Sequence, residues 1–200
     1  ITSKATNEYI FEETANFTCH LIFKMLFNNL GSIDPWKIRF RKPFHTKKLL
    51  VVGQGNIGKR VARKMNSFMR IQTFDLLQNV QSDLNLLLRD ADCVTLHIPL
   101  TEKSQNYFGQ SKLSLMKNNS VLINTSRGEI VSEDALYREL KNDRLKAAFD
   151  VFWEKPYNGK LKKFHPHKFF MTPHIASKCD QYIESAANDL DKFVEKLKHA

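Results

Sequence analysis

Paired cysteines and long apolar runs are the features that this sequence has least of. Its 200 residues contain three cysteines, Cys19, Cys93 and Cys179, which lie far apart and form no CxxC pair. This spacing excludes a disulfide framework and a zinc site, so we expect no metal, and it indicates reduced thiols in the cytoplasm. No run approaches the roughly 20 apolar residues that cross a bilayer, and the first residues lack the basic-then-apolar order of a secretory signal. We therefore expect no membrane partner.

The chain also lacks an internal repeat, a low-complexity tract and an initiating methionine, and the last of these predicts a fragment of a longer protein. A content of 42% hydrophobic and 26% charged residues is typical of a globular protein. The formal net charge of +10 suits an anionic partner, of which nucleic acid is one candidate. The basic residues are scattered, however, with only modest clusters at 37–48 and 160–168. The pattern favours a solvated surface that attracts small anions, and we expect no nucleic-acid partner.

The hydrophobic pattern changes its period along the chain. Residues 6–30 carry apolar side chains at helical spacing and end before Gly31, which predicts a long helix, and 31–48 is expected to be an irregular connector. Short apolar runs then alternate with amphipathic stretches. They predict strands at 48–53, 71–75, 93–100, 120–126, 145–152 and 168–176, and helices at 56–68, 82–91, 111–119, 133–144 and 181–200. Such alternation indicates a doubly wound α/β fold, a parallel sheet covered on both faces.

Three glycines follow the first of these strands in the stretch VVGQGNIGKRV. Gly53 permits a tight turn, Gly55 lets the backbone approach a pyrophosphate, and Gly58 allows close packing of helix on strand. The helix that begins here would present free N–H groups and the positive end of its dipole to phosphates. The sequence therefore predicts a dinucleotide site of the Rossmann type.

Asp75 strengthens this prediction, because it ends the second strand 22 residues after Gly53. A carboxylate at this place accepts hydrogen bonds from a ribose diol and repels a 2′-phosphate, which favours NAD over NADP. Two alternatives remain at this point. The glycines could form a structural turn beside an incidental Asp, or the site could hold the adenosyl cofactor of a methyltransferase.

Four later stretches narrow the choice: LHIPLTEKSQNYFG, VLINTSRGEIVSEDAL, AAFDVFWEKP and TPHIAS. Together with GQGNIGKRVA, and in this order and spacing, they resemble the NAD-dependent D-2-hydroxyacid dehydrogenases, of which phosphoglycerate dehydrogenase is a prominent member. The resemblance covers about residues 6–195. It implies a Rossmann-type NAD-binding domain and hydride transfer between NAD and a 2-hydroxy or 2-keto acid.

Two polar residues at strand ends are the candidate catalytic pair. Arg127 follows the strand at 120–126, where its guanidinium could grip the carboxylate and carbonyl oxygens of a 2-keto acid. His174 follows the last strand and could give a proton to the carbonyl oxygen as hydride arrives. A salt-bridged surface Arg and a satisfied core His are the alternatives. Of the other histidines, His97 is expected to be structural, and His165 and His167 exposed.

In the relatives a Glu directly before a Pro pairs with the catalytic His and raises its pKa. This sequence has Lys155 there and Glu154 one residue earlier. Either the loop shifts so that Glu154 reaches the imidazole, or the His works without a carboxylate, beside a Lys that lowers its pKa. We expect the first outcome, so Glu154 completes the catalytic set.

The resemblance also implies further contacts with the cofactor. Asn56 and Ile57 lie in the glycine turn, and Pro99, Thr101 and Thr125 lie in later loops. Asp150 is the expected partner of the nicotinamide carboxamide. A second threonine that the family often has after Thr101 is here Ser104, which keeps the hydroxyl.

The resemblance divides the chain into a crossing helix at 1–30, the NAD-binding domain at 31–177 and a second crossing helix at 178–200. It implies that most of a substrate domain is missing, so that both helices expose apolar faces unless something covers them. It also implies a homodimer, in which the first helix and its loop are a plausible interface.

We expect the substrate to be a small 2-hydroxy or 2-keto acid. Lys155, Lys160 and Lys162 suit a phosphorylated one, and 3-phosphoglycerate is the first expectation. The alternative is a relative that binds or senses NAD(H) without catalysis, which Lys155 supports. A nucleic-acid-associated corepressor rests on the net charge alone.

Overall fold

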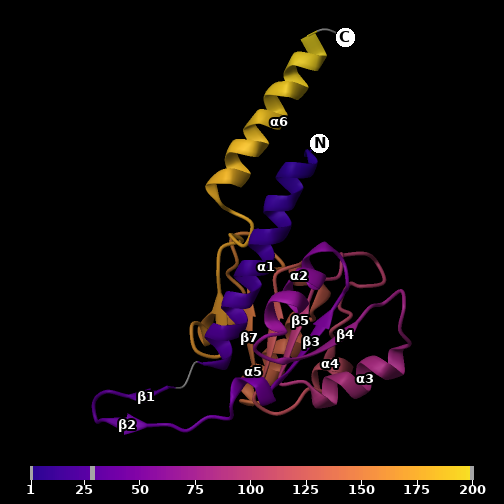
Figure 1. The fold of residues 1–200 in the computed structure, drawn as a ribbon. Helices are drawn as coiled ribbons and strands as arrows, with labels where there is room; N and C mark the ends of the chain where they lie inside the picture. The colour runs from indigo at the N-terminus through magenta and orange to yellow at the C-terminus, as the bar shows by residue number, and fades with distance from the viewer. Residues whose placement is uncertain (1, 28–29, 199–200) are drawn as a thin grey trace.

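Six parallel strands form the central sheet, in the order β4-β3-β5-β6-β7-β8 (Figure 1). The computed structural model describes residues 2–27 and 30–198. The strands are β3 (Lys48–Val52), β4 (Arg70–Phe74), β5 (Cys93–Leu96), β6 (Ser120–Asn124), β7 (Leu145–Phe149) and β8 (Phe169–Met171). Each predicted strand is present, and the parallel pairing confirms the doubly wound α/β fold.

Helices cover both faces of this sheet. They are α1 (Lys4–Leu26), α2 (Asn56–Met65), α3 (Gln81–Asp90), α4 (Gln110–Leu113) and α5 (Glu133–Lys141). Helix α6 (Asp180–Lys198) follows β8, and the chain also forms the short 3-10 turns η1 (Phe44–Thr46), η2 (Gly128–Ile130) and η3 (Lys160–Phe164). Side chains alternate across a strand. Leu49 and Val51 of β3 therefore pack with α1 and α2, whereas Leu50 and Val52 pack with α3, α4 and α5.

The connections reverse direction at the centre of the sheet. From β3 the chain passes through α2 to its neighbour β4, and from β4 it passes through α3 to β5 on the other side of β3. Ligands of open α/β sheets bind outside the carboxyl ends of the strands at such a switch point. The crevice between the ends of β3 and β5 is therefore the expected ligand site.

Several predicted boundaries are wrong. The helix expected at 111–119 is only α4, and the strand expected at 93–100 ends at Leu96, because the chain then turns away from the sheet. The connector expected to be irregular contains a hairpin, β1 (Gly31–Ser32) with β2 (Lys37–Ile38). Gly31 has φ 109°, which L side chains rarely adopt and which permits the turn into β1. The helices expected at 6–30 and 181–200 extend onto residues 28–29 and 199–200, which lie outside the described residues.

The long helix α1 buries one face against the domain. Ala15, Leu21, Ile22 and Met25 of α1 are buried, so the domain itself covers the apolar face that this helix would otherwise expose. Glu12 forms ion pairs with Arg60 and Lys64 of α2.

The expectation of an exposed apolar face holds for α6, which extends away from the sheet (Figure 1). No described residue of α6 is buried. Its apolar side chains Ile183, Leu190, Phe193, Val194 and Leu197 are 41–63% exposed. The helix is tied to the N-terminal turn of α1 by Asp189, which accepts hydrogen bonds from Ser3 N at 2.6 Å and Thr6 Oγ1 at 2.7 Å.

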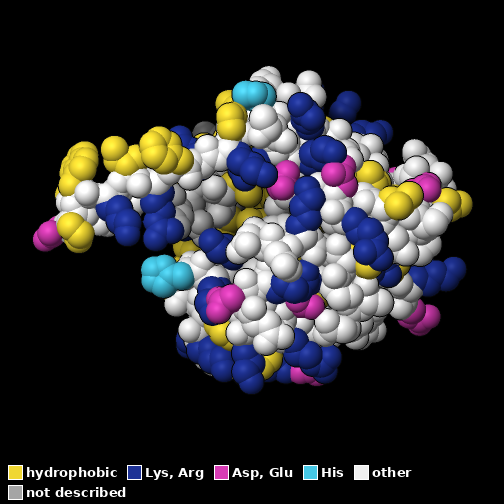
Figure 2. Space-filling view, turned by 90° about the horizontal axis from the view of Figure 1, so that it is seen from below, with side chains coloured by type: hydrophobic (Ala, Val, Ile, Leu, Met, Phe, Trp, Pro, Cys, Tyr) yellow, Lys and Arg dark blue, Asp and Glu magenta, His cyan; other side chains and the backbone are white. Residues whose placement is uncertain are grey.

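Residues 31–40, here termed the arm, project from the domain (Figure 1). Ile33, Trp36 and Phe40 of the arm are 83%, 79% and 97% exposed. Figure 2 shows the arm as a protrusion at the left on which hydrophobic side chains gather. Among the described residues, no helix is long and apolar enough to span a bilayer.

Candidate active site

The predicted site residues lie along one edge of the sheet. All six strands are parallel, so their carboxyl ends share this edge. In spatial order, the residues that follow β4, β3, β5, β6, β7 and β8 are Asp75, Gly53, Pro99, Arg127, Asp150 and His174. Adjacent strands are about 4.8 Å apart, so β3 and β6, with β5 between them, are about 10 Å apart. The fold therefore places the glycine turn, the guanidinium and the imidazole on one continuous rim.

The three glycines of the turn have different surroundings. A Cβ on Gly53, where φ is 98°, would lie 2.5 Å from the carbonyl oxygen of His97, and a Cβ on Gly58 would lie 2.0 Å from the carbonyl oxygen of Gly53. A Cβ on Gly55 would meet nothing within 4 Å. Packing of the protein itself therefore requires Gly53 and Gly58, whereas Gly55 leaves open the space through which a pyrophosphate would approach.

Helix α2 begins directly at this space. Gly55 is its N-cap, and no side chain caps the helix. Asn56 and Ile57 are its first two residues, so their N–H groups belong to the four that a helix leaves without an intrahelical acceptor. Together with the helix dipole, this end of α2 is suited to phosphate.

A cavity of about 670 Å³ lies between the ends of β3, β4 and β5, and it is termed the first cavity. Its lining includes Gly53, Gly55, Asp75, Pro99, Thr101 and Ser104, all of which the sequence analysis singled out. Asp75 is half-buried. Its carboxylate accepts hydrogen bonds from Gln54 N at 2.8 Å and Leu77 N at 2.9 Å, which fix it at the mouth of the glycine turn.

Hydrogen bonds hold the opposite wall of the first cavity. Ser104 Oγ accepts from Thr101 N at 2.7 Å and donates to Pro99 O at 2.7 Å, so the hydroxyl shapes this loop. His97 is half-buried, and its Nε2 lies 3.0 Å from Thr95 Oγ1. Burial lowers the pKa of His97 to about 3, so the ring is neutral at physiological pH. This agrees with the structural role expected for His97.

Two residues expected to contact the cofactor also have protein partners. Thr125 is buried, and its Oγ1 lies 2.8 Å from Thr18 Oγ1 of α1, so it ties the long helix to the end of β6. Asp150 is fully buried. Its carboxylate accepts from Thr172 Oγ1 at 2.6 Å, Ile175 N at 2.9 Å and Ala176 N at 2.8 Å. Both side chains thus have protein partners, and their contact with the cofactor stays a prediction.

Asp150 instead holds the loop that carries His174. Its hydrogen bonds reach the loop on both sides of the histidine, at 172 and at 175–176. His174 has φ 59°, in the left-handed region that non-glycine residues seldom adopt, and its N–H donates to Thr172 O at 2.9 Å. Such backbone strain is maintained only where the surroundings enforce it. Asp150 is therefore a positioning residue for the imidazole.

The partner of the imidazole is Lys155. Its Nζ lies 2.6 Å from His174 Nδ1. Glu154 is exposed and accepts a hydrogen bond from Asn158 N at 3.1 Å. The predicted one-residue shift of the loop is therefore wrong, and Glu154 is not the partner of His174. Desolvation lowers the pKa of His174, and the positive charges of Lys155, Arg127 and Lys178 lower it further, while Asp150 opposes them.

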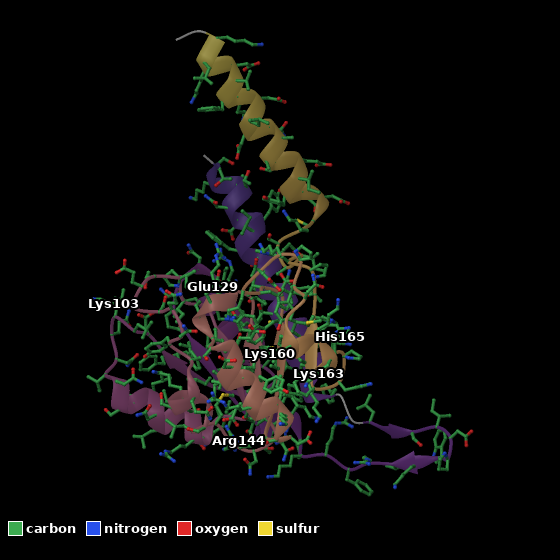
Figure 3. The ribbon with its side chains drawn as sticks, turned by 180° about the vertical axis from the view of Figure 1, so that it is seen from behind. Lys103, Glu129, Arg144, Lys160, Lys163 and His165 are labelled. Atoms are coloured by element: carbon green, nitrogen blue, oxygen red, sulfur yellow. The ribbon has the colours of Figure 1, made fainter. Side chains whose placement is uncertain are left out.

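A second cavity of about 370 Å³ lies beside this pair. Lys155, His174 and His165 line it together with the stacked rings of Phe152 and Tyr157. Lys103, from the lining of the first cavity, lies on the opposite side of the domain from His165 (Figure 3). The two cavities are thus separate places on the same sheet.

Arg127 is exposed at the end of β6, and its charge acts on His174. Its Nη1 donates to Ser126 O at 2.6 Å, and no carboxylate among the described residues forms an ion pair with it. The guanidinium therefore keeps donors for a ligand. Within the described residues, no cluster of His, Cys, Asp and Glu could hold a metal ion.

The glycine turn, Asp75, Arg127 and His174 thus follow four strands at one edge of the sheet. Residues 34–176 match the model of the D-isomer specific 2-hydroxyacid dehydrogenase family, NAD binding domain. The chain belongs to this family. The match confirms the predicted family and NAD as the cofactor of this D-2-hydroxyacid dehydrogenase domain.

The names of individual relatives support this assignment. Glyoxylate reductase of Thermococcus litoralis is 34% identical over 152 residues, which cover 70% of this chain and 46% of that protein. D-3-phosphoglycerate dehydrogenase of Methanocaldococcus jannaschii is 37% identical over 167 residues, 76% of this chain and 31% of that protein. The chain thus spans less than half of the length of these two relatives.

Among solved structures, D-lactate dehydrogenase from Aquifex aeolicus, complexed with NAD and lactic acid, superposes with a TM-score of 0.79. It is 25% identical, and the superposition covers 96% of this chain and 67% of that one. The chain therefore shares the fold of about two thirds of that NAD-bound dehydrogenase.

Sequence reasoning missed one residue that shapes the site. Asn124 is fully buried at the end of β6. Its Oδ1 accepts from Ser126 N at 3.0 Å, and its Nδ2 donates to Arg127 O at 2.8 Å, so it fixes the turn that presents Arg127. The sequence did offer one indication of this role, because Asn124 is an amide residue at the end of an otherwise apolar strand.

The lysines that suggested a phosphorylated substrate separate into two groups. Lys160 pairs with Asp134, and Lys163, labelled beside it in Figure 3, donates to Tyr137 Oη at 2.8 Å. Lys162 donates to Asn158 Oδ1 at 3.3 Å. Only Lys155 contacts the predicted catalytic residues.

Proposed function

We propose that this chain supplies the cofactor site and the proton donor of an oxidoreductase that transfers a hydride between NAD and C2 of a D-2-hydroxy acid. The observation that carries this proposal is the order of strand ends on one rim, which aligns the glycine turn, Arg127 and His174. The redox chemistry belongs to the nicotinamide, which accepts or releases the hydride when bound. The protein provides geometry, charge and a proton.

The residues present fit this cofactor. The open space at Gly55 and the uncapped start of α2, at Asn56 and Ile57, suit a pyrophosphate. Asp75 suits a ribose diol and would repel a 2′-phosphate, which favours NAD over NADP.

Arg127 and His174 suit the reacting end. In this proposal the guanidinium binds the carboxylate of the 2-keto acid in two-point fashion and polarises its carbonyl group. The imidazole gives a proton to the carbonyl oxygen during reduction and removes it during oxidation. Asp150 and Asn124 act through these two residues, because they fix the loops that carry them.

We propose a small D-2-hydroxy acid as substrate. The relatives named above are a glyoxylate reductase and a D-3-phosphoglycerate dehydrogenase, so both an unsubstituted and a phosphorylated acid belong to the class. Of the three lysines that favoured a phosphorylated acid, only Lys155 lies at His174. Lys160 and Lys162 contact Asp134 and Asn158 instead. A cytoplasmic location, inferred from three unpaired cysteines, is part of the same proposal.

We also propose that the chain forms a homodimer through the arm. Ile33, Trp36 and Phe40 are almost fully exposed, and exposed apolar clusters mark interaction sites. This agrees with the interface expected from the resemblance, the first helix and the loop that follows it.

Turnover by the full-length protein tests the proposed activity. Loss of NADH absorbance at 340 nm is followed with glyoxylate, hydroxypyruvate and phosphohydroxypyruvate. We expect turnover with at least one of them, a fall in kcat of about 10²–10⁴-fold in His174→Asn, and a raised KM in Arg127→Gln. Both variants should bind NADH like the wild type. Tight NADH binding without turnover of any keto acid would contradict the proposed activity and support a binding or sensing role.

A further inference from the structure

The contact between Lys155 and His174 joins two groups that are cations when protonated. Their nitrogens, Nζ and Nδ1, are 2.6 Å apart, which is a hydrogen bond and requires that one of them accepts. A protonated lysine has three donors and no acceptor, and a protonated histidine has two donors. At most one of the two side chains is therefore protonated while this contact persists.

General proton affinities decide which side chain keeps the proton. Lysine ordinarily holds its proton about four pH units above the point at which histidine loses it. The groups that face His174 reinforce this order. Lys155, Arg127 and Lys178 oppose a charge on the ring, and only Asp150, already engaged in three hydrogen bonds, favours one. The ammonium of Lys155 thus donates to Nδ1, and the ring carries its single hydrogen on Nε2.

This arrangement is incomplete without a second proton. A neutral imidazole that gives its Nε2 hydrogen to an alkoxide would become an imidazolate. An imidazolate is a strong base, so the transfer requires a second proton at Nδ1. Lys155 is hydrogen-bonded to the other ring nitrogen, so it can supply the compensating proton, and it is exposed, so water reaches the pair and can replace that proton.

We propose that Lys155 is a positioning residue that holds His174 as the neutral Nε2–H tautomer and replaces the proton that this histidine gives to the substrate. The proposal rests on the proposed function for its last step. In the reduction, hydride adds to C2, the carbonyl π electrons move to oxygen, and that oxygen takes the hydrogen from Nε2. Nδ1 takes a proton from the ammonium of Lys155, which becomes an amine. After the product leaves, Nε2 takes a proton from water and Nδ1 returns its hydrogen to the amine, which restores the ammonium and the Nε2–H ring. Oxidation follows the same steps in reverse.

The tautomer is measured without any turnover. Long-range ¹H–¹⁵N correlation spectra of the ¹⁵N-histidine-labelled chain report which ring nitrogen carries hydrogen, and His174→Gln assigns the signal. In the wild type we expect hydrogen on Nε2. In Lys155→Glu the new carboxylate accepts from the ring, so hydrogen moves to Nδ1 and the titration midpoint moves to higher pH. In Lys155→Met both tautomers should appear.

Lys178→Glu is the matched control, because Lys178 also lowers the pKa of His174 but has no hydrogen bond to Nδ1. It should raise the midpoint and leave hydrogen on Nε2. An Nδ1–H wild type, or a tautomer that Lys155→Glu leaves unchanged, would overturn the proposal. So would a tautomer change in Lys178→Glu equal to that in Lys155→Glu.

The proton supply is tested on the full-length protein. In Lys155→Met we expect kcat for reduction to fall steeply as pH rises through neutrality, because a lone His174 must then be protonated to donate. Lys155→Arg keeps a charged donor, so it should have the Nε2–H tautomer of the wild type. Its kcat should stay below that of the wild type, because a guanidinium releases its proton poorly. Identical pH profiles for wild type and Lys155→Met would contradict the relay. Absence of any turnover in the wild type would contradict the proposed function and leave the tautomer result standing.

Discussion

At the scale of single residues, the site depends on side chains that are held neutral or fixed by burial. His97 is the clearest case. Its ring lies in the wall of the first cavity, and burial there lowers its pKa from 6.5 to about 3. The folded protein therefore resists a proton that the unfolded chain accepts. A depressed pKa contributes stability that is present above the unfolded value and is lost as pH falls.

We expect the free energy of unfolding to decrease as pH is lowered from 7 to 5. In this window the unfolded chain protonates His97 while the folded chain does not, which costs about 2 kcal/mol. Urea unfolding of the wild type and of His97→Gln at both pH values measures the effect. The variant should lose less stability on acidification than the wild type. An equal loss in both proteins would show that His97 titrates normally in the folded state.

Residue roles could be predicted from the sequence where the motif alone decides them. Arg127 and His174 follow strands, and parallel strands bring their ends to one edge, so their approach required no knowledge of loops. Glu154 was assigned wrongly because a one-residue choice within an irregular segment depends on loop packing. The bonds of Asp150 to the 172–176 backbone and of Thr125 to α1 could not be predicted either, because both depend on tertiary packing.

At the scale of elements, the start of α2 is the feature on which the cofactor site depends. Two of its glycines are required by the fold and one is not. The Cβ of an alanine at Gly58 would clash with the Gly53 backbone, whereas one at Gly55 would enter open space.

We expect Gly58→Ala to lower the free energy of unfolding by about 3 kcal/mol, because backbone atoms cannot yield as a flexible side chain can. Gly55→Ala should change it by less than about 1 kcal/mol, the usual difference between glycine and alanine at an N-cap. Urea unfolding followed by circular dichroism measures both. Equal stabilities of the two variants would contradict the geometry of this turn.

The elements themselves were largely predictable, since strands buried on both faces read as apolar runs separated by amphipathic helices. Every strand of the large sheet was expected at its place. The short elements were not predictable from the pattern. Four-residue α4 lies within an amphipathic stretch that the pattern cannot divide, and the two-residue strands of the arm are set by Gly31 and by pairing that no hydrophobic period reveals.

At the scale of the whole molecule, two exposed apolar surfaces project from a well-packed domain. One is the arm and the other is the face of α6 (Figure 1). Lys and Arg side chains are spread over the surface seen in Figure 2, so net charge marks no single partner face there. The apolar arm is the stronger candidate for association.

We expect the chain to sediment as a dimer with twice the 23.3 kDa mass of one copy. The double variant Trp36→Asp and Phe40→Asp should sediment as a monomer, because a charge at a buried apolar contact is costly. Leu86→Asp, on an exposed part of α3, is the control and should remain dimeric. A monomeric wild type, or a dimeric arm variant, would contradict the proposed interface.

Binding of NAD at the glycine turn is the claim on which the proposed chemistry depends, and a calorimetric titration of this chain with NADH measures it most directly. The wild type should bind NADH more tightly than NADPH, because Asp75 repels a 2′-phosphate. Gly55→Ala should stay folded and lose most of its affinity, because its methyl group enters the space left for the pyrophosphate. A wild type that binds no NADH, or a folded Gly55→Ala that binds it equally well, would contradict the site.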